Sequence, residues 1–245
     1  MRLNKRRIVI TGAGSGIGRE TARVFMREGA RIAMLDIDLP AIQQLAVDNR
    51  AWAIGTDVRE EASVAAAIDQ AAQAMGGIDG VVNCAGVANG LPFESTDYAS
   101  WKAQIDTNLN GTFLVCREAT RWMRKEETAS IVNLASAQAL LPTGSSSSYT
   151  ASKGGVVAFS KTISFELAPK IRVNVVCPGT TGTPMVQAIL DGPNPDAVKR
   201  NIAAVPMGRL AATAEIADLI LFLIGPESTF ITGTAIAADG GRTRH

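Results

Sequence analysis

Short apolar runs recur along the chain and alternate with longer amphipathic segments. Most of the runs are continuous rather than alternating, which is typical of strands buried on both faces of a parallel sheet. They predict strands at residues 7–11, 31–36, 52–57, 80–83, 130–135, 172–177 and 235–238. The segments between them predict helices at residues 18–28, 40–48, 61–75, 98–124, 149–167 and 214–224. Repeated strand–helix units with short connections predict a doubly wound α/β fold.

No linker, repeat or low-complexity tract divides residues 1–245, so the sequence predicts a single domain. One region does not follow the alternation of predicted strands and helices, because it contains prolines at positions 178, 184, 193, 195 and 206. This stretch is too long for an ordinary connection, and we interpret residues 184–207 as a substrate-covering insertion. A surface excursion without a role is the alternative.

Composition excludes several classes of protein. Hydrophobic residues make up 47% of the chain and the formal net charge is +1, which does not favour a nucleic-acid surface. No apolar run reaches membrane-spanning length, and the basic N-terminus lacks the apolar region of a signal peptide. The cysteines, Cys84, Cys116 and Cys177, are dispersed without zinc spacing. These features predict a cytoplasmic protein with no membrane or nucleic-acid partner.

The chain has a single histidine, His245, at its last position. This argues against a Ser-His-Asp hydrolase and against a histidine-ligated metal, so no metal site is predicted. Acid–base chemistry must therefore use Tyr, Lys, Asp, Glu or Cys side chains.

A glycine-rich turn joins the first predicted strand to the first predicted helix. In "TGAGSGIG", the spacing G-x-x-x-G-x-G holds at Gly12, Gly16 and Gly18, whereas Ile17 breaks the stricter G-x-G-x-x-G pattern. Glycines at such a turn let the backbone approach a pyrophosphate, whose charge is favoured at a helix N-terminus. The turn therefore predicts a dinucleotide site.

The second predicted strand ends in Asp36, where an acid usually binds the ribose hydroxyls of NAD. A carboxylate there repels the additional phosphate of NADP. No basic residue replaces it, since Ile37 follows and Ser15 stands in the glycine loop. The sequence therefore favours NAD as cofactor. In the alternative interpretation Asp36 has only a structural role, and either Asp38 or neither residue binds the ribose.

Tyr149 and Lys153 are four residues apart at the start of a predicted helix, so they lie on one face. An ammonium near a phenol favours the phenolate and lowers the phenol's pKa, so Lys153 is expected to lower that of Tyr149. A phenol tuned in this way exchanges protons with an alcohol or a ketone.

The hydroxyl partner of this pair has to be chosen among several serines. Residues 145–148 are all serines that precede the helix, with Ser148 as a candidate cap. Ser136 instead follows a predicted central strand, at the edge where α/β sheets bind ligands. We therefore predict that Ser136 contacts the substrate oxygen, and that Ser145–Ser148 only lead into the helix.

Taken together, the motifs resemble one family. "TGAGSGIG", "NCAG" at 83–86, "NLNG" at 108–111, Ser136, "YTASK" and "NVVCPG" occur in the order and at the spacing of the short-chain dehydrogenase/reductase family. Cys84 replaces the second asparagine of the usual "NNAG". The resemblance implies a Rossmann-type, seven-stranded parallel sheet of order 3-2-1-4-5-6-7 with helices on both faces, and a homotetramer.

The resemblance also implies a catalytic tetrad of Asn108, Ser136, Tyr149 and Lys153. Tyr149 is expected to be the general acid/base. Lys153 is expected to lower its pKa and to hold the nicotinamide ribose. Ser136 is expected to donate a hydrogen bond to the substrate oxygen. Asn108 is expected to hold a water that links Lys153 to solvent.

The remaining cofactor contacts implied by the resemblance come from five segments. In addition to Tyr149 and Lys153, they are Gly12, Ser15, Gly16, Ile17, Gly18, Asp36, Asp57, Val58, Asn83, Ala85, Gly86, Pro178, Gly179, Thr181 and Thr183. Asp57 and Val58 are assigned to the adenine, and Thr183 and Thr181 to the nicotinamide carboxamide.

The expected substrate wall is apolar. It comprises Val87, Leu91, Ala139, Leu140, Leu141, Met185, Val186, Ile189 and Leu190, at least half of which are expected to belong to the core. No basic cluster stands near these positions in the sequence, which favours a small uncharged or weakly polar secondary alcohol or ketone.

Three alternatives remain open at this point. A 3-oxoacyl-thioester (acyl-carrier-protein) reductase would use Arg121, Arg124, Lys125 and Lys170 to bind an acidic carrier. A sugar or polyol dehydrogenase is the second alternative. A non-catalytic dinucleotide sensor is the third, although a sensor has no need to keep all four tetrad residues.

Overall fold

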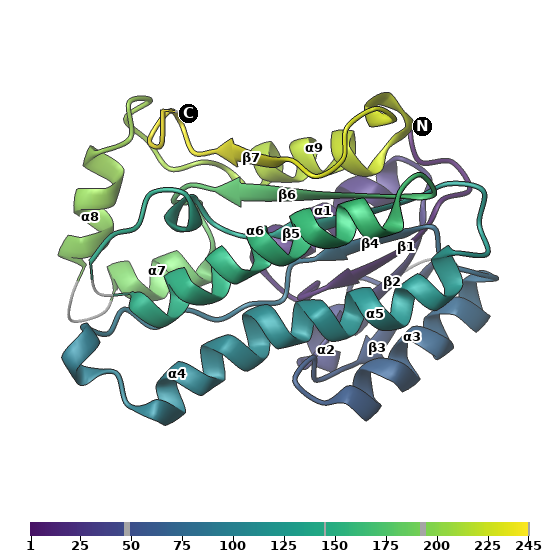
Figure 1. Ribbon diagram of the computed structural model, residues 1–245, viewed down its shortest axis with the longest axis horizontal. Helices are drawn as coiled ribbons and strands as arrows, with labels where there is room; N and C mark the ends of the chain where they lie inside the picture. Colours follow the sequence, from purple (N-terminus) through teal and green to yellow (C-terminus); the bar gives the residue numbers. More distant parts are fainter. Residues whose placement is uncertain (47–49, 145, 192–194, 245) are drawn as a thin grey trace.

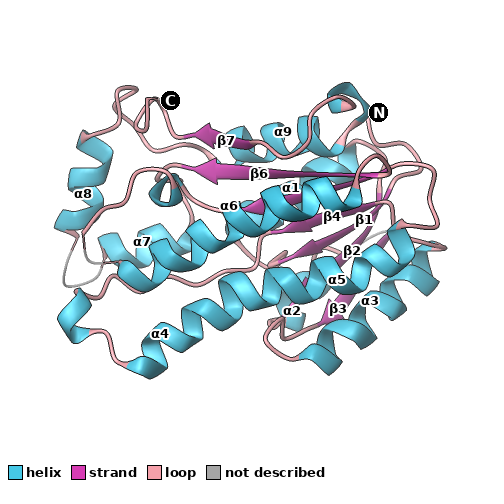
Figure 2. Cartoon of the chain, in the orientation of Figure 1, coloured by secondary structure: helices cyan, strands magenta, loops and turns pink. Residues whose placement is uncertain are grey.

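A computed structural model describes residues 1–46, 50–144, 146–191 and 195–244. Its centre is a parallel sheet of order β3-β2-β1-β4-β5-β6-β7 over these residues (Figures 1 and 2). The strands are β1 (Arg7–Thr11), β2 (Arg31–Asp36), β3 (Ala51–Gly55), β4 (Gly80–Asn83), β5 (Ala129–Leu134), β6 (Ile171–Pro178) and β7 (Ala235–Ala238). The predicted fold class and strand order are confirmed.

Helices cover both faces of this sheet (Figure 1). The α-helices of the described residues are α1 (Gly16–Arg27), α2 (Leu39–Gln43), α3 (Glu61–Met75), α4 (Tyr98–Gln104), α5 (Gly111–Met123), α6 (Ser147–Leu167), α7 (Pro184–Leu190), α8 (Asp196–Ala203) and α9 (Thr213–Ile224).

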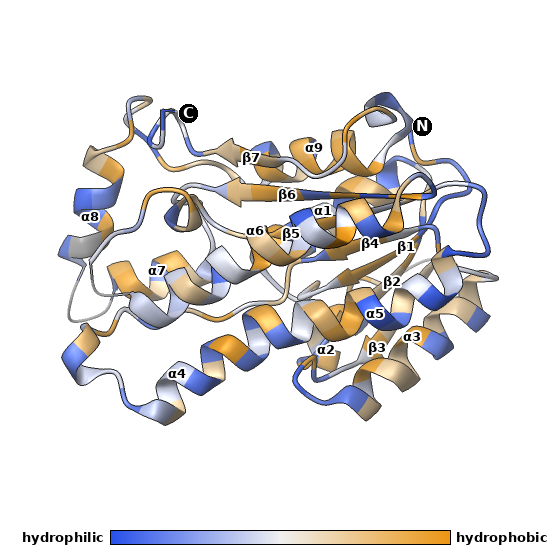
Figure 3. Ribbon diagram, viewed as in Figure 1, coloured by the Kyte–Doolittle hydropathy of each residue, from blue (hydrophilic) through white to orange (hydrophobic). Residues whose placement is uncertain are grey.

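The strands separate two large apolar clusters, because successive side chains of a strand point to opposite faces. In β1, Ile8 and Ile10 join the cluster that holds α1 and α9, whereas Val9 joins the cluster that holds α3 and α5. Figure 3 shows the strands mostly in the hydrophobic colour. Because both faces of the sheet are buried, its strands consist of continuous apolar runs.

A π-helical segment, Ile105–Asn110, interrupts the helix predicted at 98–124 and connects α4 to α5. Asn108 lies in this segment, and its main-chain carbonyl accepts a hydrogen bond from the Thr112 hydroxyl at 2.7 Å. Such π turns are often found at functional sites. The interior asparagine noticed in the sequence therefore marks a local change of helix type.

Helices α6 and α2 differ from their predicted bounds in ways that change an interpretation or a length. Helix α6 begins at Ser147 with Ser146 at its N-cap position, so the interpretation of Ser148 as the cap is wrong. The Ser148 hydroxyl instead accepts a hydrogen bond from Gln104 Nε2, which ties α6 to α4. Helix α2 is shorter than the predicted 40–48, and Asp48, Ser145, Pro193 and His245 lie outside the described residues.

The proline-rich region contains α7 and α8. Thr183 caps α7, since its hydroxyl accepts a hydrogen bond from the Val186 N–H at 3.4 Å, and Pro184 occupies the first helical turn, where its missing N–H has no cost. In Figure 2 the arrowheads of the strands point toward the end of the molecule where α7 and α8 lie. Across the described residues, no helix combines the length and apolar character needed to cross a membrane.

Candidate active site

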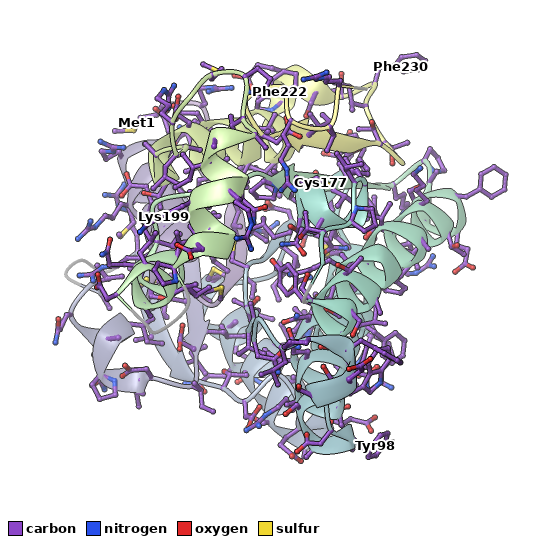
Figure 4. The ribbon with its side chains drawn as sticks, turned by 90° about the vertical axis from the view of Figure 1, so that its left-hand side faces the viewer. Met1, Tyr98, Cys177, Lys199, Phe222 and Phe230 are labelled. Carbon is purple, nitrogen blue, oxygen red and sulfur yellow. The ribbon has the colours of Figure 1, made fainter. Side chains whose placement is uncertain are left out.

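A cleft of about 570 Å³ lies at the carboxyl edge of the sheet. The glycine loop before α1, the ends of β2, β4, β5 and β6, the start of α6 and the two helices α7 and α8 all contribute to its lining. Figure 4 looks at this end of the molecule and labels Cys177, near the end of β6, and Lys199 on α8. This is the edge at which open α/β sheets bind ligands.

Glycines are required in the loop between β1 and α1. Gly12 has φ +64°, and a Cβ added there would lie 2.7 Å from the backbone nitrogen of Ala85. A Cβ on Gly18 would collide with the carbonyl oxygen of Gly12. The loop is therefore pressed against the end of β4, which leaves its outer backbone surface facing the cleft.

The same loop fits the pyrophosphate of a dinucleotide. Ser15 occupies the N-cap of α1 without a capping hydrogen bond from its side chain, and Ser15, Gly16, Ile17 and Gly18 line the cleft. The N-terminus of a helix attracts anions through its free N–H groups and its dipole. Thr183 lies against Gly16, since a Cβ there would come within 3.3 Å of Thr183 Cγ2.

Two carboxylates line the cleft beside β2 and β3. Asp36 accepts hydrogen bonds from the N–H groups of Gly14, at 2.8 Å, and Asp38, at 3.0 Å. Asp38 caps α2 by accepting from the Ala41 N–H. Asp57 binds Arg59 through Nε and Nη2, and this hydrogen-bonded pair holds the pKa of Asp57 below its ordinary value. Asp36 thus both stabilises the loop and faces the cleft.

The Lys153 ammonium is buried and donates a hydrogen bond to the Leu134 carbonyl at 2.8 Å. Its Nζ lies 5.9 Å from the centroid of the Tyr149 ring, as the one-turn spacing on α6 predicts. Burial lowers the pKa of Lys153 to about 8, because the charged form loses its hydration. This residue therefore lies within reach of proton exchange near neutral pH.

Tyr149 and Ser136 meet in the cleft. Burial is the largest influence on the Tyr149 phenol and raises its pKa, while its hydrogen bond with Ser136 lowers it by a smaller amount. The expectation that Lys153 would lower this pKa is not met, because Lys153 is engaged with Leu134 and burial outweighs other influences. The phenol is accordingly protonated at neutral pH.

Asn108 is buried beneath the cleft rather than in its lining. Its Oδ1 accepts from the Val87 N–H at 2.8 Å, and its Nδ2 donates to the Val87 carbonyl at 3.0 Å and to the Ser152 hydroxyl at 3.0 Å. A Cβ on Gly86 would lie 3.2 Å from Asn108 Oδ1 and 3.4 Å from Lys153 Nζ. Asn108 therefore joins the segment after β4 to α6, directly beside Lys153.

Asn83 does not reach the cleft. Its Nδ2 donates to Asn133 Oδ1 at 2.8 Å and to Cys116 Sγ at 3.3 Å, inside the sheet. Asn83 is the last residue of β4, and its side chain points into the core. It therefore has a structural role here instead of the predicted contact with the cofactor. Every other predicted cofactor contact lines the cleft: Gly12, Ser15, Gly16, Ile17, Gly18, Asp36, Asp57, Val58, Ala85, Gly86, Tyr149, Lys153, Pro178, Gly179, Thr181 and Thr183.

The predicted apolar wall is only partly in the cleft. Val87, Met185, Val186 and Ile189 line it, whereas Ala139 and Leu140 pack against a buried cluster with Val156. Leu91, Leu141 and Leu190 are also absent from its described lining.

Several cleft residues carried no signal in the sequence. Gln138 is held by the hydroxyls of Ser146, at 2.6 Å, and Thr150, at 3.4 Å, both donating to its Oε1. Asn201 on α8 and Arg242 after β7 also line the cleft. No motif marks these positions, although Gln138 could have been suspected from its place two residues after Ser136.

The chain is similar to known proteins over almost its whole length. Residues 12–243 match the family model described as Enoyl-(Acyl carrier protein) reductase. The chain is 35% identical to 2-(S)-hydroxypropyl-CoM dehydrogenase 3 of Xanthobacter autotrophicus, over 99% of this chain and 98% of that protein. The chain belongs to the short-chain dehydrogenase/reductase family.

Two further members of the short-chain dehydrogenase/reductase family show its range. D-threitol dehydrogenase of Mycolicibacterium smegmatis is 36% identical, over 99% of this chain and 94% of that protein. The crystal structure of 3-ketoacyl-(acyl-carrier-protein) reductase from Brucella melitensis complexed with NADH superimposes with a TM-score of 0.91 and 31% identity, over 98% of this chain and 99% of that chain. The protein is thus an oxidoreductase of a family that uses nicotinamide dinucleotides, and its glycine cradle fits that group.

The buried Lys153 gives a pH test of the site. Below about pH 8 the lysine is protonated in both the folded and unfolded states, so the cost of burying its charge is fully present. Between pH 8 and about 10.4 the folded state loses this proton first, and the cost disappears. We expect the stability of Lys153→Met, relative to the wild type, to be greatest below pH 8 and to fall by on the order of 1–3 kcal/mol toward pH 10. Denaturant unfolding at pH 7 and pH 9.5 measures this difference.

Lys161→Met is the matched control, because Lys161 lies on the exposed side of the same helix. Its stability relative to the wild type should not change between the two pH values. The same pH independence in Lys153→Met would contradict the lowered pKa.

Proposed function

We propose that this protein is an NAD(H)-dependent oxidoreductase that interconverts a secondary alcohol and a ketone, with Tyr149 as general acid/base. The observation that carries the proposal is the meeting of Ser136, Tyr149 and Lys153 in one cleft with the glycine loop. The proposal treats residues 1–245 as one catalytic domain, with residues 184–207 covering the substrate.

Proton transfer in this proposal belongs to Tyr149. In the reductive direction the protonated phenol donates its proton to the ketone oxygen, while Ser136 donates a hydrogen bond to the same oxygen. In the oxidative direction the phenolate takes the proton of the alcohol, so oxidation should become faster as pH rises. When bound, the nicotinamide supplies or accepts the hydride at the substrate carbon.

Lys153 and Asn108 support Tyr149 as the proton donor in this proposal. Lys153 places a positive charge beside Tyr149, which stabilises the phenolate after proton transfer. Asn108 supports Lys153 through the segment that contains Gly86 and Val87. A water held beside Asn108 and linked to Lys153 remains part of the proposal.

NAD is proposed in preference to NADP because Asp36 lines the cleft at the end of β2. Both of its oxygens already accept backbone N–H groups, so its position is rigid. A fixed carboxylate there would repel the 2′-phosphate of NADP.

The substrate class has two alternatives. A 3-oxoacyl-thioester reductase is favoured by the description of the family model and by the similarity to the Brucella reductase. The basic residues suggested for carrier docking, however, lie around the end of α5 and the start of β6, at the edge of the sheet opposite the cleft. A polyol dehydrogenase is favoured by the similarity to D-threitol dehydrogenase. An NAD-coupled screen of secondary alcohols, polyols and 3-hydroxyacyl thioesters distinguishes the three.

We further propose a cytoplasmic homotetramer. The three cysteines are free, which suits a reducing compartment. Tyr98 on α4 and Phe165 on α6 are 77% and 90% exposed, respectively. Large exposed aromatic groups of this kind are suited to burial between subunits.

Replacing Tyr149 by Phe should lower turnover by about 10²–10⁴-fold, because the proton donor is lost while the ring still fills its space. NADH binding, measured by fluorescence titration, should persist. The control is Tyr98→Phe, since Tyr98 is the only other tyrosine of the sequence and lies outside the cleft lining. Near-normal turnover of Tyr149→Phe would remove Tyr149 from the mechanism.

The wild type should bind NAD at least about tenfold more tightly than NADP, and Asp36→Asn should reduce this preference. Asp38→Asn is the control, because this neighbouring carboxylate caps α2. Calorimetric titration of both cofactors measures the ratio. Loss of preference in Asp38→Asn but not in Asp36→Asn would assign the role to Asp38.

Light scattering should give the mass of a tetramer, about four times 25.7 kDa. The physical reason is burial of the exposed aromatic residues of α4 and α6 between subunits. A monomer at micromolar concentration would contradict this proposal.

A further inference from the structure

Arg242 is placed in the cleft by a rigid turn at the end of the chain. After β7, the Asp239 carboxylate accepts hydrogen bonds from the N–H groups of Gly241, at 3.0 Å, Arg242, at 3.2 Å, and Thr243, at 2.9 Å. The Met207 N–H donates to the Gly240 carbonyl at 3.2 Å, which fastens the turn to the end of the insertion. The backbone of Arg242 is therefore well defined, although it lies close to the C-terminus.

The guanidinium of Arg242 has no anionic partner among the described residues. The residue is half-buried and lines the cleft. Its nearest carboxylate in sequence, Asp239, is already saturated by backbone N–H groups. Some other arginines of the chain are paired with carboxylates, for example Arg59 with Asp57 and Arg209 with Glu215. A partly buried arginine is usually paired, so its free donors are available to a ligand.

No acidic residue of the described cleft lining comes from the chain after β6, the part that contains Arg242. The lining residues that come from the chain after β6, among them Thr180, Val198 and Asn201, carry no negative charge. The acidic residues of the described lining, Asp36 and Asp57, follow β2 and β3. Strand order places β2 and β3 at one margin of the sheet and β7 at the other, with four strands between β2 and β7. Arg242 is therefore the only charged residue that the described lining takes from the chain after β6.

We propose that Arg242 binds an anionic group of the substrate, a carboxylate or sulfonate, at a distance from the reacting carbon. The inference rests on the proposed function and narrows its substrate to hydroxy acids and the corresponding oxo acids. It replaces the uncharged substrate expected from the sequence. A planar guanidinium suits this role because it binds carboxylates through two parallel hydrogen bonds.

The test compares acids with their esters. Initial rates with NAD are measured for 3-hydroxybutyrate and 4-hydroxycyclohexanecarboxylate, each beside its methyl ester. The wild type should prefer at least one acid over its ester. In Arg242→Met the acid-to-ester ratio of kcat/KM should fall by roughly 10- to 100-fold, as expected for loss of a charge-assisted contact. Arg242→Lys should retain part of the ratio, which separates recognition of charge from misfolding.

Arg244→Met is the matched control. Arg244 is two residues further along, is exposed, and lines a different hollow beside Arg209 and Glu215. Its acid-to-ester ratio should equal that of the wild type. An unchanged ratio in Arg242→Met would overturn the proposal. A raised KM for NAD with an unchanged ratio would also overturn it, by assigning Arg242 to a cofactor phosphate.

Failure of the proposed function can be distinguished from failure of the role proposed for Arg242. If the wild type oxidises none of the four probes, the reaction assignment fails for this substrate range, and binding decides the inference. Calorimetric titration of 4-oxocyclohexanecarboxylate into the NADH-loaded protein should then show binding that is roughly tenfold weaker in Arg242→Met. Equal binding by both proteins, or none by the wild type, would overturn the role of Arg242.

Discussion

The hydrogen bond from the buried Lys153 ammonium to the Leu134 carbonyl is the contact on which the site depends. It joins α6 to the last residue of β5. The same contact therefore sets the distance between Tyr149, one turn before Lys153, and Ser136, two residues after Leu134. The cost of burying the ammonium is visible in its pKa of about 8. In the proposed function this cost has a purpose, because the charge is needed beside the phenol, in a place from which most water is excluded.

Buried polar side chains keep α6 in register with the sheet. Asn83 on β4 donates to Asn133 on β5, and Asn133 donates to the Ser160 hydroxyl on α6 at 2.9 Å. Asn108 adds a second connection through Ser152. Small hydroxyl side chains on α6 allow the helix to approach the strands closely, and the buried hydroxyls of Ser148, Ser152 and Ser160 all take part in hydrogen bonds. Rigidity of this kind is what a catalytic arrangement requires, since small displacements of the reacting groups lower the rate.

Much of the fold could be predicted because it depends on local pattern. The strands β1, β2, β4 and β7 begin and end where the apolar runs do, and the strand order follows from the family's motifs. The π-helical turn at Asn108 could not be predicted, because its stability depends on contacts with Val87 and Ser152. The pKa of Tyr149 was misjudged for a related reason. Spacing shows that Lys153 is near, but only the packed structure shows that burial outweighs its charge.

The sequence by itself determined the architecture, the position of the glycine loop and the residues able to exchange a proton, because periodicity and residue type are properties of short segments. Only the tertiary structure decided which of these side chains face the same space. It turned Asn83 inward and brought Arg242 from beyond the last strand into a cleft whose other parts come from the first three-quarters of the chain and the insertion. The physical reason is that side-chain direction follows from the pleat and from packing against distant neighbours, which no local pattern records.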